Sequence, residues 1–340
     1  MSRAEGRLLE VDALRGLAAL AVMLFHYSTR FESLFGHSSE LSWSFPHGFY
    51  GVNLFFMISG FVILMTLART RRPMDFVVSR FSRLFPAYWV AVLLAFAVTS
   101  LAGLPGKTVG LGDALLNLTM VHTWFDRPLV DNVYWTLGVE MIFYVQAFTL
   151  FVTGQIRRFP LLILALLALR LGYFLAERLW GVALPFLAFR FLLLGFIPYF
   201  GLGVALFRCH QRGRGAVEDA IVIAASLLTV ALVESVSAAL VSAALFAVFA
   251  LAVGGRLAVL RRAPLVWLGT ISYPLYLLHE NIGWCAIRTL EALGVGSDLA
   301  VLAALLLALG LASMLHYAVE APAMMAIRRA WRARFVEVAT

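Results

Sequence analysis

Residues 9–27, which read LEVDALRGLAALAVMLFHY, predict an apolar helix that carries one arginine and one histidine. On a regular α-helix, Arg15 and His26 are about 20° apart around the axis and roughly 16 Å apart along it, so both lie on one face. A charged side chain inside a membrane costs at least ~2.5 kcal/mol unless it is paired, which makes such residues candidate functional groups. The alternative is a plain anchor helix, with Arg15 and His26 near opposite membrane surfaces.

The composition is that of a membrane protein. Hydrophobic residues make up 62% of the 340 residues and charged residues only 14%, a balance that excludes an ordinary soluble protein. The formal net charge of +8 does not indicate nucleic-acid binding, because most basic residues lie in the segments that connect the apolar runs, on one side of them. Cys209 and Cys285 lack the spacing of zinc or redox sites. We therefore expect no metal and no nucleic-acid partner.

Apolar runs of roughly 17–25 residues predict ten membrane-spanning helices. The expected spans are 9–28, 49–68, 84–103, 133–153, 159–179, 189–207, 217–234, 238–255, 265–290 and 299–319. The fold class is thus all-α, a polytopic membrane helical bundle of about ten transmembrane helices, and residues 1–340 form a single membrane domain. The first span is expected to be retained and not removed as a signal peptide. An apolar piece at 114–125 is too short to cross and is expected to form a lid or re-entrant segment.

Basic residues divide unevenly between the two ends of these spans. Of the 27 arginines and lysines, nineteen fall on the side of the two termini and six on the opposite side, while Arg15 and Arg170 lie inside spans. The positive-inside rule then places both termini in the cytoplasm. The nineteen are Arg3, Arg7, Arg69, Arg71, Arg72, Arg80, Arg83, Arg157, Arg158, Arg208, Arg212, Arg214, Arg256, Arg261, Arg262, Arg328, Arg329, Arg332 and Arg334.

Several polar residues are expected at similar depths in the outward-facing half of the bundle. Counting ~1.5 Å per residue along each span places His26, Glu140 and His279 in that half, with Glu280 next to the last. A histidine oriented by a carboxylate is a common general base. The alternative is that each residue lies separately in the polar interfacial band, and depth does not distinguish the two.

The connection between the second and third spans offers an anion site at the inner face. Arg80 and Arg83, three residues apart at an expected helix start, project together and can fork onto phosphate oxygens. The alternative is a topology anchor or a lipid-headgroup contact. In the second span, Ser59 and Gly60 mark a place where a second backbone or a long ligand can approach closely.

These residues fall in ordered motifs that resemble the acyltransferase-3 family of integral membrane O-acyltransferases. The motifs are VDALRGLAA at 11–19 with Phe25 and His26, GVNLFFMISGF at 51–61, RFSRLFPAYW at 80–89, WTLGVE at 135–140, LGTISYPLYLLH at 268–279 and YAVEAP at 317–322. Residues 155–260 match in hydropathy only. The chain departs from the family pattern at Asn53, where an aspartate is common, and at 141–142.

The resemblance implies an enzyme of the bacterial inner (plasma) membrane that moves an acyl group, usually acetyl from acetyl-CoA, to a hydroxyl of an extracytoplasmic glycan sugar or, in some members, of a small hydroxylated acceptor. It also implies that Arg15, His26, Arg80 and Arg83 are essential. Many members carry an additional esterase-like domain, which is not expected here. The chain would then transfer the group directly, or act with a separate periplasmic transferase or polysaccharide-export machinery.

The residue pattern and the family resemblance agree with one mechanism. In it, Arg80 and Arg83 bind the phosphates of acyl-CoA, and the pantetheine arm lies beside Ser59 and Gly60 of the second span. His26 is then the general base, or carries the acyl group briefly. Glu140 or His279 orients His26 or binds the sugar, and Arg15 holds a carboxylate or the donor arm.

A secondary transporter of a glycan precursor or small solute remains an alternative, because transporters also use charged residues inside the membrane. Such proteins often consist of two related halves, and this sequence has no halved symmetry. A structural subunit of a polysaccharide-export complex is a second alternative, and it should tolerate loss of Arg15 and His26.

Overall fold

The computed structural model describes residues 8–182, 184–213 and 215–336, and every regular element in these ranges is helical. The long helices are α1 (Leu9–Phe25), α3 (Tyr50–Arg69), α4 (Pro73–Ala102), α6 (Trp135–Val152), α7 (Phe159–Trp180), α9 (Ile197–Arg212), α10 (Val217–Val233), α11 (Val236–Val253), α12 (Ala263–Leu278), α13 (Glu280–Ala292), α14 (Ser297–Leu315) and α15 (Ala321–Val336). Short helices are α2 (Phe31–Phe35), α5 (Leu111–Asn117) and α8 (Phe186–Phe191). Of the basic residues used in the topology argument, Arg3, Arg7 and Arg214 lie outside the described residues.

Six of the described helical segments are long and apolar enough to cross a membrane. They are Pro46–Arg69, Pro73–Ala102, Asn132–Val152, Ile156–Trp180, Val236–Val253 and Ser297–Arg334. The all-helical membrane fold expected from the sequence is confirmed in this form. The count of ten spans, the cytoplasmic termini and the lid at 114–125 stay predictions.

The chain forms two compact units, each assembled from three segments. The first unit takes the described residues up to 18, then 50–70 and 139–269, and the second takes 19–49, 71–138 and the described residues from 270 onward. Helices α1, α6 and α12 each contribute residues to both units. The single membrane domain expected over 1–340 stays a prediction.

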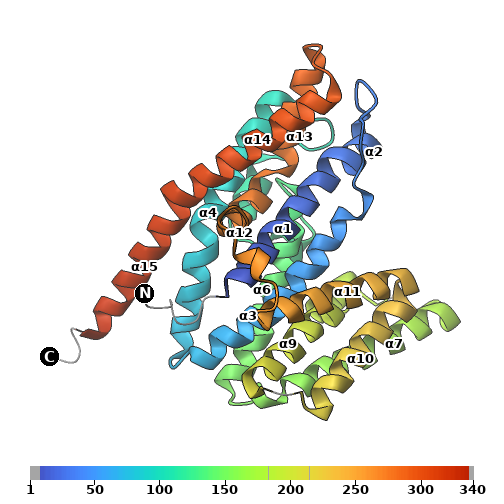
Figure 1. The fold of residues 1–340 in the computed structure, drawn as a ribbon, viewed down its shortest axis with the longest axis vertical. Helices are drawn as coiled ribbons and strands as arrows, with labels where there is room; N and C mark the ends of the chain where they lie inside the picture. Colours follow the sequence, from blue (N-terminus) through green and yellow to red (C-terminus); the bar gives the residue numbers. More distant parts are fainter. Residues whose placement is uncertain (1–7, 183, 214, 337–340) are drawn as a thin grey trace. The chain divides into compact units, whose positions relative to one another are not determined.

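In the first unit, α3 packs against α9, and glycines allow the two backbones to meet (Figure 1). A Cβ at Gly203 would lie 1.9 Å from the Met57 carbonyl oxygen, and a Cβ at Gly60 would lie 2.5 Å from that of Phe200. The small residue at position 60 therefore admits a neighbouring helix backbone. Helix α10 packs against α7, α9 and α11 in the same unit.

In the second unit, α4 packs along α15, and α13 packs against α14. Figure 1 shows α14 and α15, in orange to red, as one long rod. The residues that join them, His316–Glu320, form a π-helix, η7. Single π-turns within α-helices are rare and occur frequently at functional sites.

Three of the expected spans differ in their bounds from the helices that the structure contains. Helix α4 begins at Pro73 and not near residue 84, because proline suits the first helical turn and arginine continues a helix readily. Arg80 and Arg83 therefore lie within a helix and not in a loop that precedes one. The expected span 265–290 is interrupted at His279, between α12 and α13. The expected span 189–207 begins as a long helix only at α9, where a proline again occupies the first turn.

Candidate active site

His26 begins a π-helix, η1 (His26–Arg30), that directly continues α1. This turn is fixed against α13 by two hydrogen bonds. The Trp284 indole donates to the His26 carbonyl at 3.0 Å, and the Tyr27 hydroxyl donates to the His279 carbonyl at 2.7 Å. Gly283 leaves the necessary room, because a Cβ there would lie 2.0 Å from the Tyr27 hydroxyl oxygen. The position of His26 is thus set by the start of α13.

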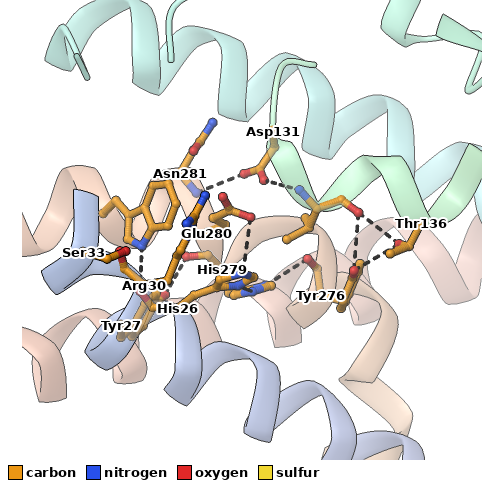
Figure 2. A network of polar contacts seen from close by, with 12 residues as sticks. His26, Tyr27, Arg30, Ser33, Asp131, Thr136, Tyr276, His279, Glu280 and Asn281 are labelled. Carbon is orange, nitrogen blue, oxygen red and sulfur yellow. Dashed lines mark hydrogen bonds and ion pairs between the residues drawn. The ribbon is translucent and has the colours of Figure 1, made fainter. Parts of the chain in front are cut away.

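His26 and His279 form a hydrogen-bonded pair (Figure 2). His26 Nδ1 lies 2.8 Å from His279 Nε2, and the two rings stack with their centroids 5.0 Å apart. His279 Nδ1 lies 3.1 Å and 2.9 Å from the carbonyl oxygens of Leu275 and Tyr276. Because carbonyl oxygens only accept, His279 Nδ1 carries a proton, and Nε2 of the neutral ring accepts from His26 Nδ1. In a neutral pair, His26 Nε2 is therefore the unprotonated nitrogen, available as a base.

This nitrogen faces a buried carboxylate. His26 Nε2 lies 3.8 Å from Glu280 Oε2, and the Glu280 side chain is 1% exposed. Within the described residues this oxygen has no hydrogen-bond partner. A carboxylate in this position stabilises the imidazolium that forms when Nε2 takes a proton.

Asp131, which precedes α6, holds the start of α13 in place. Its carboxylate oxygens accept from the backbone N–H groups of Val133 at 3.2 Å and Asn281 at 3.0 Å (Figure 2). Asn281 Nδ2 also donates to the Val130 carbonyl at 2.8 Å. Burial raises the pKa of the Asp131 carboxyl to about 6, against the two N–H groups and the Lys107 charge, which lower it. The backbone beside Glu280 is thus tied to this loop.

Arg83 belongs to a buried ion-pair network at the π-helix η7. Its Nη1 donates to Glu320 Oε1, and His316 Nδ1 lies 2.7 Å from Glu320 Oε2. The Glu320 side chain is fully buried, and the Tyr273 ring centroid lies 5.9 Å from the Arg83 guanidinium carbon. The charge of Arg83 is therefore balanced within the protein.

Arg80 is placed differently. Its Nη2 donates to Ser79 Oγ at 3.3 Å, but its Nε is buried and has no hydrogen-bond partner among the described residues. Ser79 lines a cavity of about 380 Å³ between α4 and α15. Of the two arginines expected to bind phosphate, Arg80 thus keeps an unsatisfied donor.

The other predicted site residues, Arg15, Ser59, Gly60 and Glu140, belong to the first unit. Arg15 on α1 and Glu140 on α6 are partly buried. Ser59 Oγ is buried and has no hydrogen-bond partner in the part of the chain that the structure describes, whereas Gly60 contacts the backbone of α9. The structure brings His26 together with His279, and the roles of these four residues stay predictions.

Two carboxylates that the sequence did not select, Asp131 and Glu320, complete these sites together with Glu280, which the sequence placed at the depth of His279 without a role of its own. Glu280 carries a usable signal, since it follows His279 directly. Glu320 lies in a family-like motif, but nothing in the sequence indicates a partner 237 residues away. Asp131 lies in a loop without any periodic pattern.

Comparison with known proteins gives a consistent assignment. A family model described as an acyltransferase domain matches residues 8–317. The exopolysaccharide production protein ExoZ of Rhizobium meliloti (strain 1021) is 29% identical over 302 residues, which cover 80% of this chain and 88% of that protein.

Two further relatives match over shorter stretches. Acyltransferase MdmB of Streptomyces mycarofaciens is 30% identical over 151 residues, 41% of this chain and 38% of that protein. Peptidoglycan O-acetyltransferase OatA of Listeria monocytogenes is 29% identical over 154 residues, 40% of this chain and 22% of that protein. No solved structure shows a significant match. Because the family model covers nearly the whole chain, the protein belongs to the acyltransferase-3 family of integral membrane acyltransferases.

Proposed function

We propose that this protein is an O-acyltransferase of the bacterial inner membrane that moves an acyl group, acetyl in the simplest case, from cytoplasmic acyl-CoA to a hydroxyl of an extracytoplasmic glycan sugar. The observation that carries the proposal is the pair of His26 and His279, because its hydrogen bonds leave His26 Nε2 as a base. Relatives named for exopolysaccharide production and for peptidoglycan O-acetylation support a glycan acceptor.

In this reaction His26 Nε2 takes the proton of the acceptor hydroxyl while the hydroxyl oxygen attacks the thioester carbonyl carbon. The carbon–sulfur bond breaks, and the imidazolium returns the proton to the sulfur, which yields an ester and a free thiol. Glu280 stabilises the imidazolium, and His279 keeps His26 in the required tautomer. A general base of this kind contributes ~10²–10⁴-fold to the rate. The same nitrogen can also attack the thioester itself and carry the acyl group before the hydroxyl arrives.

On the inner side, Arg80 offers its unsatisfied donor to the phosphates of the acyl-CoA, whereas Arg83 is paired with Glu320 and holds α4 against the π-helix η7. The excess of basic residues on this side of the expected spans supports its cytoplasmic location. Arg15, Glu140 and the Ser59 region retain the roles given by the sequence, in binding the donor arm or the sugar.

Inverted membrane vesicles test this proposal, because they expose the cytoplasmic face to added donor. Radiolabelled acetyl-CoA should label glycan inside vesicles that contain the wild-type protein, and His26→Asn should abolish the label. A secondary transporter would instead move the glycan precursor without attaching label to it. Transport of unlabelled solute, with no covalent labelling at normal protein level, would overturn the proposal.

A further inference from the structure

Two basic side chains lie beside the histidine that is proposed as the base. Arg30 ends the π-helix η1 that His26 begins, and Figure 2 shows both residues in one cluster with Glu280. Lys107 Nζ lies 5.1 Å from the centroid of the Trp284 ring, whose indole donates to the His26 carbonyl. The charges of both basic residues act on His26 and on Glu280. All of these residues belong to the second unit.

A third basic residue, Arg288, extends this group along neighbouring aromatic rings. The Phe35 ring packs edge-on against Trp284 with the centroids 5.5 Å apart, and the guanidinium carbon of Arg288 lies 5.1 Å from the Phe35 centroid. Cations at these distances are attracted to the faces of the rings, which keeps Lys107 and Arg288 near the start of α13. We call Arg30, Lys107 and Arg288 the cation cluster.

The cation cluster has no counter-ion in direct contact. Among the described residues, its side chains form no hydrogen bond and no ion pair, whereas Arg127, another basic residue of the expected outer side, is paired with Asp113 at 2.8 Å. Arg30 and Arg288 are exposed and Lys107 is half-buried, so a ligand can reach all three. Their donors are thus available to an anion.

Topology and charge balance do not account for this position. Cations beside a general base oppose the positive charge that the base takes up, so the cation cluster works against the proton transfer proposed for His26. The expected outer side has few basic residues, six against nineteen, and the cation cluster takes three of those six. The nearby carboxyls of Glu280 and Asp131 are two acids against three cations, and a proton on either one enlarges the excess. A bound anion removes this excess.

We propose that the cation cluster binds a negatively charged group of the acceptor, so that the glycan which this enzyme acylates is acidic. The inference rests on the proposed function and specifies its acceptor as a glycan that bears a carboxylate or a phosphate near the acylated hydroxyl. Arg30 and Arg288 can fork onto either group, while Lys107 contributes a point charge. The bound acid group holds the hydroxyl near His26 Nε2 and offsets the repulsion between the cation cluster and the imidazolium.

The host's own surface glycan, freed of its O-acyl groups with mild base, is the acceptor that tests the inference. One portion has its carboxylates reduced to hydroxymethyl groups, and a second has its phosphate esters removed. Each portion is offered with saturating acetyl-CoA to the full-length protein in phosphatidylcholine nanodiscs, which leave both faces open and carry no net lipid charge. The KM for the untreated glycan should be at least roughly tenfold below that for the portion that lacks the recognised group, because one charged hydrogen bond contributes about that factor. The portion that loses the preference identifies the group as a carboxylate or a phosphate.

Substitutions in the cation cluster separate recognition of the acid group from a structural role. Lys107→Gln and Arg30→Gln should each raise the KM for the untreated glycan roughly tenfold and leave the KM for the neutral portion unchanged. Lys107→Arg keeps the charge and should keep the preference. Arg178→Gln removes an exposed arginine of the expected outer side, in the last turn of α7, and should change neither KM.

Equal KM values for all portions, a glycan without any acid group, or variants that change the KM for charged and neutral portions alike overturn the inference. The proposed function still stands in these cases if acetyl reaches glycan in a His26-dependent manner. Binding of the same portions is measured on the same nanodiscs, so the inference is also tested where no transfer occurs. Binding that depends on the acid group and on Lys107, without any transfer, refutes the proposed function and leaves the anion site in place. Equal binding of all portions overturns the inference.

Discussion

Two substitutions of His279 separate the two kinds of hydrogen bond that its ring makes. His279→Gln places an amide oxygen near the position of Nε2, so His26 Nδ1 keeps an acceptor. His279→Asn places its amide near the position of Nδ1, so it can bond to the carbonyls of Leu275 and Tyr276 but leaves His26 without that acceptor. The two side chains are similar in polarity, so the comparison isolates the contact between the histidines.

The expected loss in His279→Asn follows from the 2.8 Å hydrogen bond between His26 Nδ1 and His279 Nε2. When His26 Nε2 takes a proton, this becomes a hydrogen bond from a charged donor, which contributes ~1.5–3 kcal/mol. At ~1.4 kcal/mol per factor of ten, kcat should fall roughly 10- to 150-fold. The KM for acetyl-CoA should change little, because the donor phosphates bind elsewhere. His279→Gln should stay within roughly tenfold of the wild-type kcat.

The assay is the initial rate of label transfer from acetyl-CoA in inverted vesicles, normalised to the amount of folded protein. A merely structural role for His279 would lower the folded fraction and leave kcat per folded molecule unchanged in both variants. Equal losses of kcat in the Asn and Gln variants, or no loss in either, would refute the orienting role of His279.

Three further predictions concern stability in detergent, measured by thermal unfolding. Because burial raises the pKa of Asp131 to about 6, this carboxyl contributes fully to the free energy of unfolding below about pH 4 and loses that contribution as the pH rises through about 6. The free energy of unfolding should therefore fall by roughly 3 kcal/mol over this range. Asp131→Asn should remove this pH dependence. Glu320→Gln deprives Arg83 of its counter-charge and should destabilise the fold by roughly 3 kcal/mol, with partial recovery when Arg83→Gln is added. Gly203→Ala places a Cβ 1.9 Å from a carbonyl oxygen and should cost ~1–3 kcal/mol, whereas Gly172→Ala on α7 meets nothing within 4 Å and should be neutral or stabilising. The first argument fails if the stability of the wild type does not depend on pH. The second fails if Glu320→Gln is as stable as the wild type, and the third fails if the two alanine substitutions change stability equally.

Hydropathy was sufficient to predict the long apolar helices, because a chain that crosses a membrane must satisfy its backbone hydrogen bonds internally, but it gave no indication of α15, which lies beyond the last expected span. It was a poor guide to where they begin and break. Helix α4 starts at Pro73, well before the apolar run, since charged residues such as Arg80 are good helix formers. At the interruption at His279, a ring nitrogen lies within hydrogen-bond distance of carbonyls of the preceding turn, and hydropathy carries no trace of that contact.

The candidate site was predictable only in part for a related reason. Depth along a helix can be counted from the sequence, which is why His26 and His279 were both selected. Which helix faces meet depends on packing, and the hydrogen bond between these rings joins residues 253 positions apart. The same holds for Arg83, whose buried partner Glu320 was assigned no role. The tautomer of His26 followed only once both partners of His279 were known.

The central claim is that His26 Nε2 is the base that accepts the proton of the acceptor hydroxyl. The most direct test is the rate of acyl transfer by His26→Asn, with its affinity for acetyl-CoA measured on the same preparation. Our account predicts that the transfer rate falls at least ~100-fold while the affinity for acetyl-CoA is unchanged. Transfer at the wild-type rate by a folded, donor-binding His26→Asn variant would contradict it.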